Sequence, residues 1–131
     1  MSPCKILVVD DEKNIRLMLS RALASAETAV DTAVNGEEAL DKFAQTAYDL
    51  VLLDLMLPGI DGLQVLRRIR DSRPEVPVIL LTAHGTVENA VEAMRIGAVN
   101  YLQKPFAPQE LRDAVAAALA RKTNDRMTND E

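Results

Sequence analysis

Ionisable or hydroxyl side chains stand at the ends of four short apolar runs in this sequence. Asp10 and Asp11 follow KILVV, Asp54 follows DLVLL, Thr82 ends VPVILLT, and Lys104 follows NYLQ. If these runs are parallel strands, their carboxyl ends meet at one edge of a sheet, where open α/β proteins bind ligands. Three crowded carboxylates would repel one another unless their oxygens held a hard divalent cation. The pattern therefore predicts a Mg²⁺ site beside Asp54 that leaves room for a phosphate oxygen.

Each of these residues taken alone has an ordinary structural explanation. An aspartate after a strand is most often a helix N-cap or a turn residue. Thr82 alone is most often a strand-end hydroxyl, and the Lys104–Pro105 pair alone carries almost no information. The functional interpretation rests on the conjunction, because all of these side chains are expected at the same edge of one sheet.

The elements that must position these residues alternate regularly along the chain. The apolar runs occupy 5–10, 28–34, 49–54, 76–82 and 100–104. Between them, apolar residues recur with helical spacing. The stripes are Ile15, Met18, Leu19, Ala22 and Leu23; Ala39, Leu40, Phe43 and Ala44; Leu63, Leu66 and Ile69; Val87, Ala90, Val91 and Met94; and Leu111, Val115, Ala118 and Leu119. A strand–helix unit repeated five times, with continuously apolar strands, predicts an α/β fold whose parallel sheet is covered on both faces.

Length and composition narrow the class of protein. With 131 residues the chain is long enough for one domain with a real core. A net charge of −5 argues against nucleic acid or an anionic membrane as the direct partner. One cysteine cannot form an internal disulfide, and no segment reaches 18 apolar residues, so we expect a cytoplasmic protein. Residues 122–131 are polar and non-periodic, and are expected to form a frayed tail or linker stub after a domain spanning 1–121.

Four motifs together resemble the response-regulator receiver domains of two-component signalling, over about residues 4 to 121. The motifs are VVDDE (8–12), LLDLMLPGIDG (52–62), LTAHG (81–85) and GAVNYLQKPF (97–106). The stretch from Thr82 to Phe106 looks most like receivers of NtrC-type transcriptional activators, with FixJ-type receivers also close. The resemblance implies a CheY-like, flavodoxin-like (βα)5 fold with strand order 2-1-3-4-5.

The resemblance also implies a role for each residue of the site. Asp54 would be the phosphoacceptor for a sensor histidine kinase, and Lys104 would contact the phosphoryl group. Asp11 and Asp54 would bind Mg²⁺ directly, Asp10 mainly through water, and Met56 through its backbone carbonyl. The physical demands of phosphoryl transfer agree, because the reaction needs an in-line nucleophile and neutralised charge more than it needs proton chemistry.

A conformational switch is expected to follow phosphorylation. By resemblance, Thr82 would hydrogen-bond a phosphoryl oxygen, Tyr101 would be the aromatic switch, and the Lys104–Pro105 peptide would be cis. A hydroxyl that moves toward the phosphoryl group opens space that a ring on the adjacent strand can fill. The chain would then be a phosphoacceptor that promotes only its own phosphorylation and dephosphorylation, rather than an enzyme, with transcription as the expected output.

Three alternatives remain beside this interpretation. A phosphohydrolase of the haloacid-dehalogenase type would need an acid/base aspartate two residues after Asp54, where this chain has Met56. A flavodoxin-like nucleotide binder would need a glycine- or hydroxyl-rich phosphate loop after the first strand, whereas DDEKN is acidic. A pseudo-receiver would fold without being phosphorylated and would act as an interaction module.

Surface residues lead to three further expectations. Leu17, with Ile15 and Met18 at the edge of the buried stripe, is a candidate docking patch for the kinase, although these residues could equally complete the core. The last helix is rich in alanine, and charges lie on helix 4 (Glu88, Glu92 and Arg95) and helix 5 (Arg112 and Asp113). These features suggest a homodimer through helix 4, strand 5 and helix 5; the alternative is a solvated helix of high propensity. Met56 and His84 are placed to exclude or hold the hydrolytic water, which predicts slow self-dephosphorylation, although His84 could be only a loop side chain.

Overall fold

Five strands alternate with five helices in the computed structural model, which describes residues 4–83 and 87–129. The strands are β1 (Cys4–Val9), β2 (Thr28–Ala33), β3 (Leu50–Asp54), β4 (Val78–Thr82) and β5 (Asn100–Gln103). The helices are α1 (Lys13–Leu23), α2 (Gly36–Gln45), α3 (Gly62–Ser72), α4 (Val87–Ile96) and α5 (Pro108–Asn129). The predicted strand–helix repeat is therefore confirmed.

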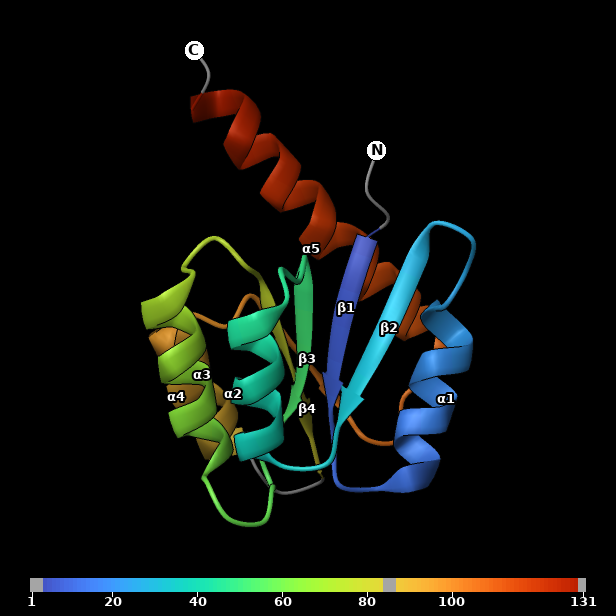
Figure 1. Ribbon diagram of the computed structural model, residues 1–131, viewed down its shortest axis with the longest axis vertical. Helices are drawn as coiled ribbons and strands as arrows, with labels where there is room; N and C mark the ends of the chain where they lie inside the picture. Colours follow the sequence, from blue (N-terminus) through green and yellow to red (C-terminus); the bar gives the residue numbers. More distant parts are fainter. Residues whose placement is uncertain (1–3, 84–86, 130–131) are drawn as a thin grey trace.

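The strands form one parallel sheet in the order β2-β1-β3-β4-β5, as expected (Figure 1). Strands β1 and β3 are neighbours near the middle of the sheet, with Val9 level with Leu53. The chain crosses over after β2, so β1 and β3 end side by side at a topological switch point. Asp10 and Asp54, which come directly after these paired residues, are thereby brought to the same edge.

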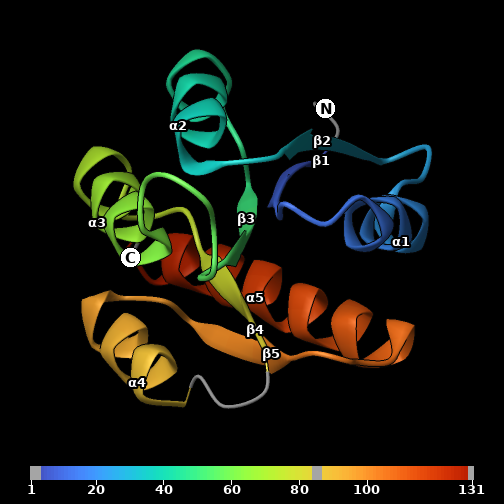
Figure 2. The ribbon, with the colours of Figure 1, turned by 90° about the horizontal axis from the view of Figure 1, so that it is seen from below.

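Helices cover both faces of the sheet, which explains why the central strands are continuously apolar (Figure 2). Leu7, Val51 and Leu80 point into one core cluster, which α2, α3 and α4 close. Val8, Leu52 and Ile79 point into the other cluster, beneath α1 and α5. Successive strand residues thus alternate between two cores, and β1, β3 and β4 hold the strand ends in a rigid frame.

In the loop after β3, the backbone at Gly62 packs closely against the backbone at Leu55. A Cβ atom on Gly62 would lie 2.6 Å from the Cα atom of Leu55, so only glycine fits at the start of α3. Asp61 caps this helix, because its Oδ1 accepts a hydrogen bond of 3.1 Å from the backbone N–H of Leu63. The segment that follows Asp54 is therefore fixed at both ends.

Helix α5 extends further than the sequence analysis expected. Its helical backbone continues through Asn129, beyond the boundary that we placed at residue 121, and Figure 1 shows its last turns projecting past the sheet. A helix that already has a folded first half needs no new nucleation to continue, so polar residues can extend it. Residues 130–131 of the expected tail lie outside the described residues. Within the ranges described, no helix combines the length and hydrophobicity needed to cross a bilayer.

Candidate functional site

Asp54 is a buried carboxylate at the carboxyl end of β3. Its exposed fraction is 2%, and its Oδ1 accepts a hydrogen bond of 3.0 Å from the backbone N–H of Met56. The Lys104 Nζ lies 3.2 Å from its Oδ2. Burial raises the pKa of Asp54, the hydrogen bond from Met56 opposes that shift, and the nearby Asp10 carboxylate adds to it. The group is thus a strand-end carboxylate whose charge depends on nearby cations.

Asp10 is fully buried beside Asp54. Its Oδ1 accepts a hydrogen bond of 2.9 Å from the backbone N–H of Glu12, and its backbone carbonyl accepts one of 2.9 Å from Arg16. Its Oδ2 makes an ion pair of 2.8 Å with Lys104 and has no further hydrogen-bond partner among the described residues. A fully buried oxygen with an unused lone pair can still accept a further hydrogen bond or contact a cation.

Lys104 brings a positive charge from the edge strand to these carboxylates. Its Nζ lies within ion-pair distance of the carboxylates of Asp10, Asp54 and, at 3.5 Å, Glu12. Its backbone N–H donates a hydrogen bond of 2.7 Å to the carbonyl of Thr82. The peptide bond to Pro105 is cis, as expected. Burial lowers the pKa of Lys104, but the Asp10 and Asp54 carboxylates outweigh that effect and leave the pKa raised. The ammonium group therefore stays charged at neutral pH.

The predicted acidic cluster is present. Asp10, Asp11 and Asp54 each offer one oxygen, and these oxygens lie within 4.8 Å of one another. Asp10 and Asp54 are buried while Asp11 is exposed, so the cluster opens to solvent on the Asp11 side. An all-oxygen donor set that is open on one side suits a hard cation that keeps several waters, and Mg²⁺ has that preference. The oxygen donor set, open to solvent at Asp11, therefore fits a magnesium ion.

The two proposed switch residues lie on adjacent strands. Thr82 is buried at the end of β4, where its Oγ1 donates a long hydrogen bond of 3.4 Å to the carbonyl of Leu102. Register pairs Thr82 with Gln103 and Leu80 with Tyr101, so the tyrosine lies on the same face of the sheet as Thr82. The ring of Tyr101 is 48% exposed. The hydroxyl and the ring therefore lie on one face of two adjacent strands, offset by two residues, with the ring at the surface.

Three contacts at the site were not predicted from the sequence. Glu12 lies beside Lys104, Arg16 binds the Asp10 carbonyl, and the backbone N–H of Met56 holds Asp54. The third acidic residue of VVDDE was the available signal for Glu12. Met56 itself is 56% exposed. His84 lies outside the described residues, so its expected position near the site stays a prediction.

Comparison with known proteins gives one consistent family. The family model for the response regulator receiver domain matches residues 6–116. The transcriptional regulatory protein ResD of Bacillus subtilis is 47% identical over 89% of this chain, and the regulatory protein AtoC of Escherichia coli is 46% identical over 88%. These matches cover 48% of ResD and 25% of AtoC, so the chain spans about half or less of the relatives' length.

The fold agrees with the same family. The crystal structure of NtrX from Brucella abortus in complex with ADP matches 98% of this chain with a TM-score of 0.93 and 36% identity, over 30% of the NtrX chain. The expected likeness to NtrC-type regulators is confirmed, since such proteins are among these relatives. With a 2-1-3-4-5 sheet, an acidic cluster at its switch point and a family match along most of its length, the chain belongs to the receiver domains of two-component response regulators.

Proposed function

We propose that Asp54 accepts a phosphoryl group from a cognate sensor histidine kinase in a Mg²⁺-dependent reaction, and that this controls an output of the protein. The observation that carries the proposal is the position of Asp54 between the Lys104 ammonium group, 3.2 Å away, and the Asp10–Asp11 carboxylates. A nucleophile beside one fixed cation and a cluster able to hold another suits phosphoryl transfer. A phosphorylation-independent interaction module would have no use for this arrangement.

The acidic residues would divide between metal binding and orientation. Asp11 and Asp54 would bind Mg²⁺ directly and Met56 would offer its backbone carbonyl, whereas Asp10, already paired with Lys104, would act through water. The ion would supply charge neutralisation for the transferred oxygens. Because burial raises the pKa of Asp54, a cation beside it would also favour its ionised, nucleophilic form.

The transfer would use the chain's own residues as follows. An Asp54 carboxylate oxygen attacks phosphorus as the bond from phosphorus to the kinase histidine nitrogen breaks, and the bonding electrons stay on the imidazole. The Lys104 ammonium group exchanges its contact with the Asp54 oxygen for one with a phosphoryl oxygen. Thr82 exchanges its long hydrogen bond to Leu102 for one to the phosphoryl group, and Tyr101 fills the vacated space.

The wider biological setting belongs to the proposal as well. The partner would be a histidine kinase, and the location would be cytoplasmic because the kinase draws its phosphoryl group from ATP. Transcription is the output that we infer, since ResD and AtoC are regulatory proteins of which this chain matches one part. The domain would promote only its own phosphorylation and dephosphorylation, without acting on another substrate.

Phosphorylation by acetyl phosphate tests the proposal directly. Intact-mass spectrometry of the chain with acetyl phosphate and Mg²⁺ should show one added phosphoryl group, which EDTA prevents and Asp54→Ala abolishes. Asp41→Ala is the matched control, because Asp41 is an exposed carboxylate on α2, away from the cluster. Full labelling of Asp54→Ala, or labelling that ignores EDTA, would contradict the assignment of Asp54 as a metal-dependent phosphoacceptor.

A further inference from the structure

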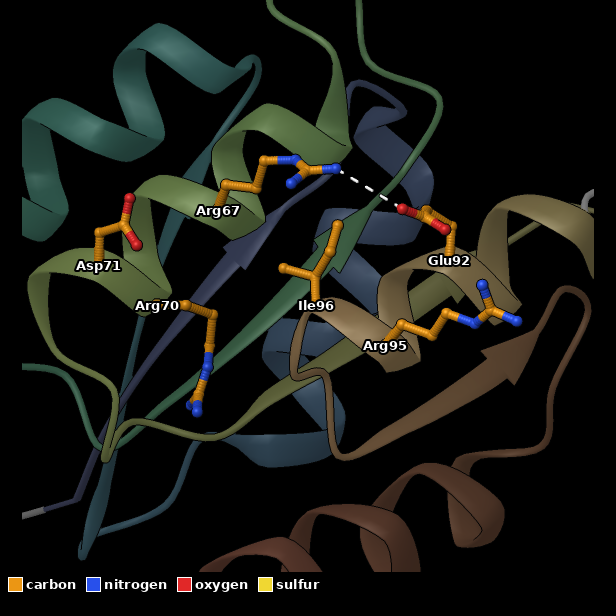
Figure 3. A pocket seen from close by; sticks show the side chains of 6 residues that line it. All are labelled: Arg67, Arg70, Asp71, Glu92, Arg95 and Ile96. Carbon is orange, nitrogen blue, oxygen red and sulfur yellow. Dashed lines mark ion pairs between the residues drawn. The ribbon is translucent and has the colours of Figure 1, made fainter.

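A polar groove between α3 and α4 is separate from the phosphoacceptor site. It has a volume of about 400 Å³ and is lined by Arg67, Arg70, Asp71, Glu92, Arg95 and Ile96 (Figure 3). These residues lie between the middle and the C-terminal end of each helix. The helices of a parallel α/β sheet run opposite to the strands, so this part of the groove is remote from the strand ends that carry Asp54.

Positive charge in the groove is only partly compensated. Arg67 makes an exposed ion pair of 3.6 Å with Glu92. Arg70 donates a hydrogen bond to the neutral backbone carbonyl of Pro74 and makes no ion pair among the side chains that the structure describes. Arg95 makes neither an ion pair nor a hydrogen bond within the described ranges, and Figure 3 shows Asp71 on the opposite side of α3 from Arg95. Two guanidinium groups are therefore available to an anionic partner.

The backbone after α4 is shaped to fit one of these arginines. Gly97 has a φ of +134°, and a Cβ atom there would lie 2.6 Å from the Nε of Arg70. Glycine at this turn therefore lets the Arg70 side chain lie against the end of α4. This packing holds Arg70 against a neighbouring element, so the arginine is more restrained than one on an isolated solvated helix.

The directions of the side chains indicate the kind of anion. In Figure 3 the three guanidinium groups point in different directions. Arg67 points toward Glu92, Arg70 toward the loop that follows α3, and Arg95 away from α3. One compact phosphate could not reach all three. An extended segment with several spaced carboxylates could reach each in turn, because each guanidinium group forms paired hydrogen bonds with a carboxylate.

We infer that the α3–α4 groove is a docking site for an acidic polypeptide segment of a partner protein. The chain carries a net charge of −5, so most of its surface repels such a segment and the groove would orient it. The weak Arg67–Glu92 pair opens on binding, since its two side chains are 58% and 46% exposed and lose little when separated. The apolar Ile96 provides contact area between the charged groups.

A fluorescein-labelled hexaglutamate peptide tests this inference by fluorescence anisotropy at low salt. Saturable binding should weaken by about fivefold in Arg95→Glu and again as salt rises. Arg68→Glu is the matched control, because it changes the net charge equally from an exposed position on α3 outside the groove, and its effect should stay under about twofold. Equal acetyl phosphate labelling of both variants would show that they fold.

Three results would overturn the inference. The first is an absence of hexaglutamate binding at low salt, and the second is an equal loss of affinity in both variants, which would indicate a general charge effect. The third is tighter, Arg95-dependent binding of pyrophosphate or of a DNA duplex, which would make the groove a site for a small anion or for nucleic acid. None of these outcomes depends on whether Asp54 is phosphorylated.

Discussion

Met56 follows Asp54 by two positions, and we expect its side chain to cover the approach to Asp54 from solvent. Met56 is 56% exposed, and its backbone N–H donates a hydrogen bond to Asp54 Oδ1. Hydrolysis of an aspartyl phosphate needs a water in line with the bond that breaks, and a thioether is too weak an acceptor to hold that water. An apolar side chain here therefore predicts a long-lived phosphorylated state, suited to gene regulation.

Replacing Met56 with Asn should shorten that lifetime. The amide can hydrogen-bond the attacking water, so phosphate loss should accelerate severalfold, which corresponds to about 1 kcal/mol in the barrier. Decay of the phosphorylated wild type and of Met56→Asn is followed by intact mass after the donor is removed, with Met56→Leu as the apolar control. Equal decay rates, or a slower Asn variant, would show that water access at this position does not set the lifetime.

Tyr48 carries a second titratable contact, far from the phosphoacceptor. Its hydroxyl donates a hydrogen bond of 2.6 Å to Asp31, and its ring stacks near Phe43 in the core beneath α2. Burial, followed by the bond to Asp31, raises the pKa of Tyr48 to about 12. The neutral phenol is therefore favoured in the folded state, whereas the unfolded chain loses this proton near pH 10.

The folded state should accordingly lose stability in strong alkali. The contribution is complete below about pH 10 and disappears as the pH rises toward 12, with a magnitude of up to about 2 kcal/mol. Urea unfolding of the wild type and of Tyr48→Phe between pH 9 and about 11.5 should show a smaller loss in the variant. Tyr101→Phe, which changes an exposed ring, should follow the wild type. Parallel curves for wild type and Tyr48→Phe would contradict the role of this hydroxyl.

At the scale of single elements, α1 and α5 form the best candidate for kinase docking. Leu17 is 44% exposed and, with Met18, Pro108 and Arg112, lines a groove of about 550 Å³ beside the loop that carries Asp11. This exposure favours the docking interpretation for Leu17. Met18 also packs against the core, so it serves both purposes. A helix of the kinase could dock here and present its histidine to Asp54.

Substituting Leu17 with Asp should slow phosphoryl transfer from the cognate kinase about tenfold or more, because it places a charge in an apolar contact. Labelling by acetyl phosphate, which needs no docking, should be unchanged. Val91→Asp is the control, since Val91 is an equally exposed apolar residue on α4, away from this groove. If Leu17→Asp leaves the kinase reaction unchanged, then Leu17 is not part of the docking surface.

Strands could be located from sequence because the three central strands are almost continuously apolar and turn residues bound all five runs. Every observed strand begins and ends within two residues of its apolar run, and the acidic, hydroxyl and lysine residues lie where those runs stop. The extension of α5 was missed because it has no apolar stripe to reveal a helix. The contact of Glu12 with Lys104 and the open charges of Arg70 and Arg95 depend on rotamers and neighbouring helices, which sequence spacing does not specify.

At the scale of the whole molecule, the face formed by α4, β5 and α5 is the proposed site of a phosphorylation-enhanced homodimer. Val91, Met94 and Tyr101 expose apolar area there. Two of the charged residues expected to align the two subunits make other contacts. Glu92 forms an ion pair with Arg67 of α3, and Arg112 lines the α1–α5 groove. The side chain of Glu88 lies outside those described. The apolar residues therefore carry the proposal.

Sedimentation with and without beryllofluoride tests this association. Beryllofluoride, as a phosphoryl mimic, should shift the chain from monomer toward dimer at micromolar concentration, because inward movement of Tyr101 reshapes the face. Val91→Asp should weaken the dimer, and Leu17→Asp, on the α1 side, should leave it intact. A monomer in both conditions at high micromolar concentration would count against the dimer.

Strand β5 is the least anchored strand of the sheet, and it leads directly into Lys104. Only Leu102 among its four residues is buried, and β4 separates it from the carboxylates that Lys104 contacts. Local opening costs least where few buried contacts are lost, so the backbone amides of β5 should exchange with solvent deuterium sooner than those of β1 or β3. Any change at Asp54 that strengthens or weakens its ion pair with Lys104 should alter how often β5 separates from β4. The protection of this edge strand is thus a measure of the chemistry at the centre of the sheet, two strands away.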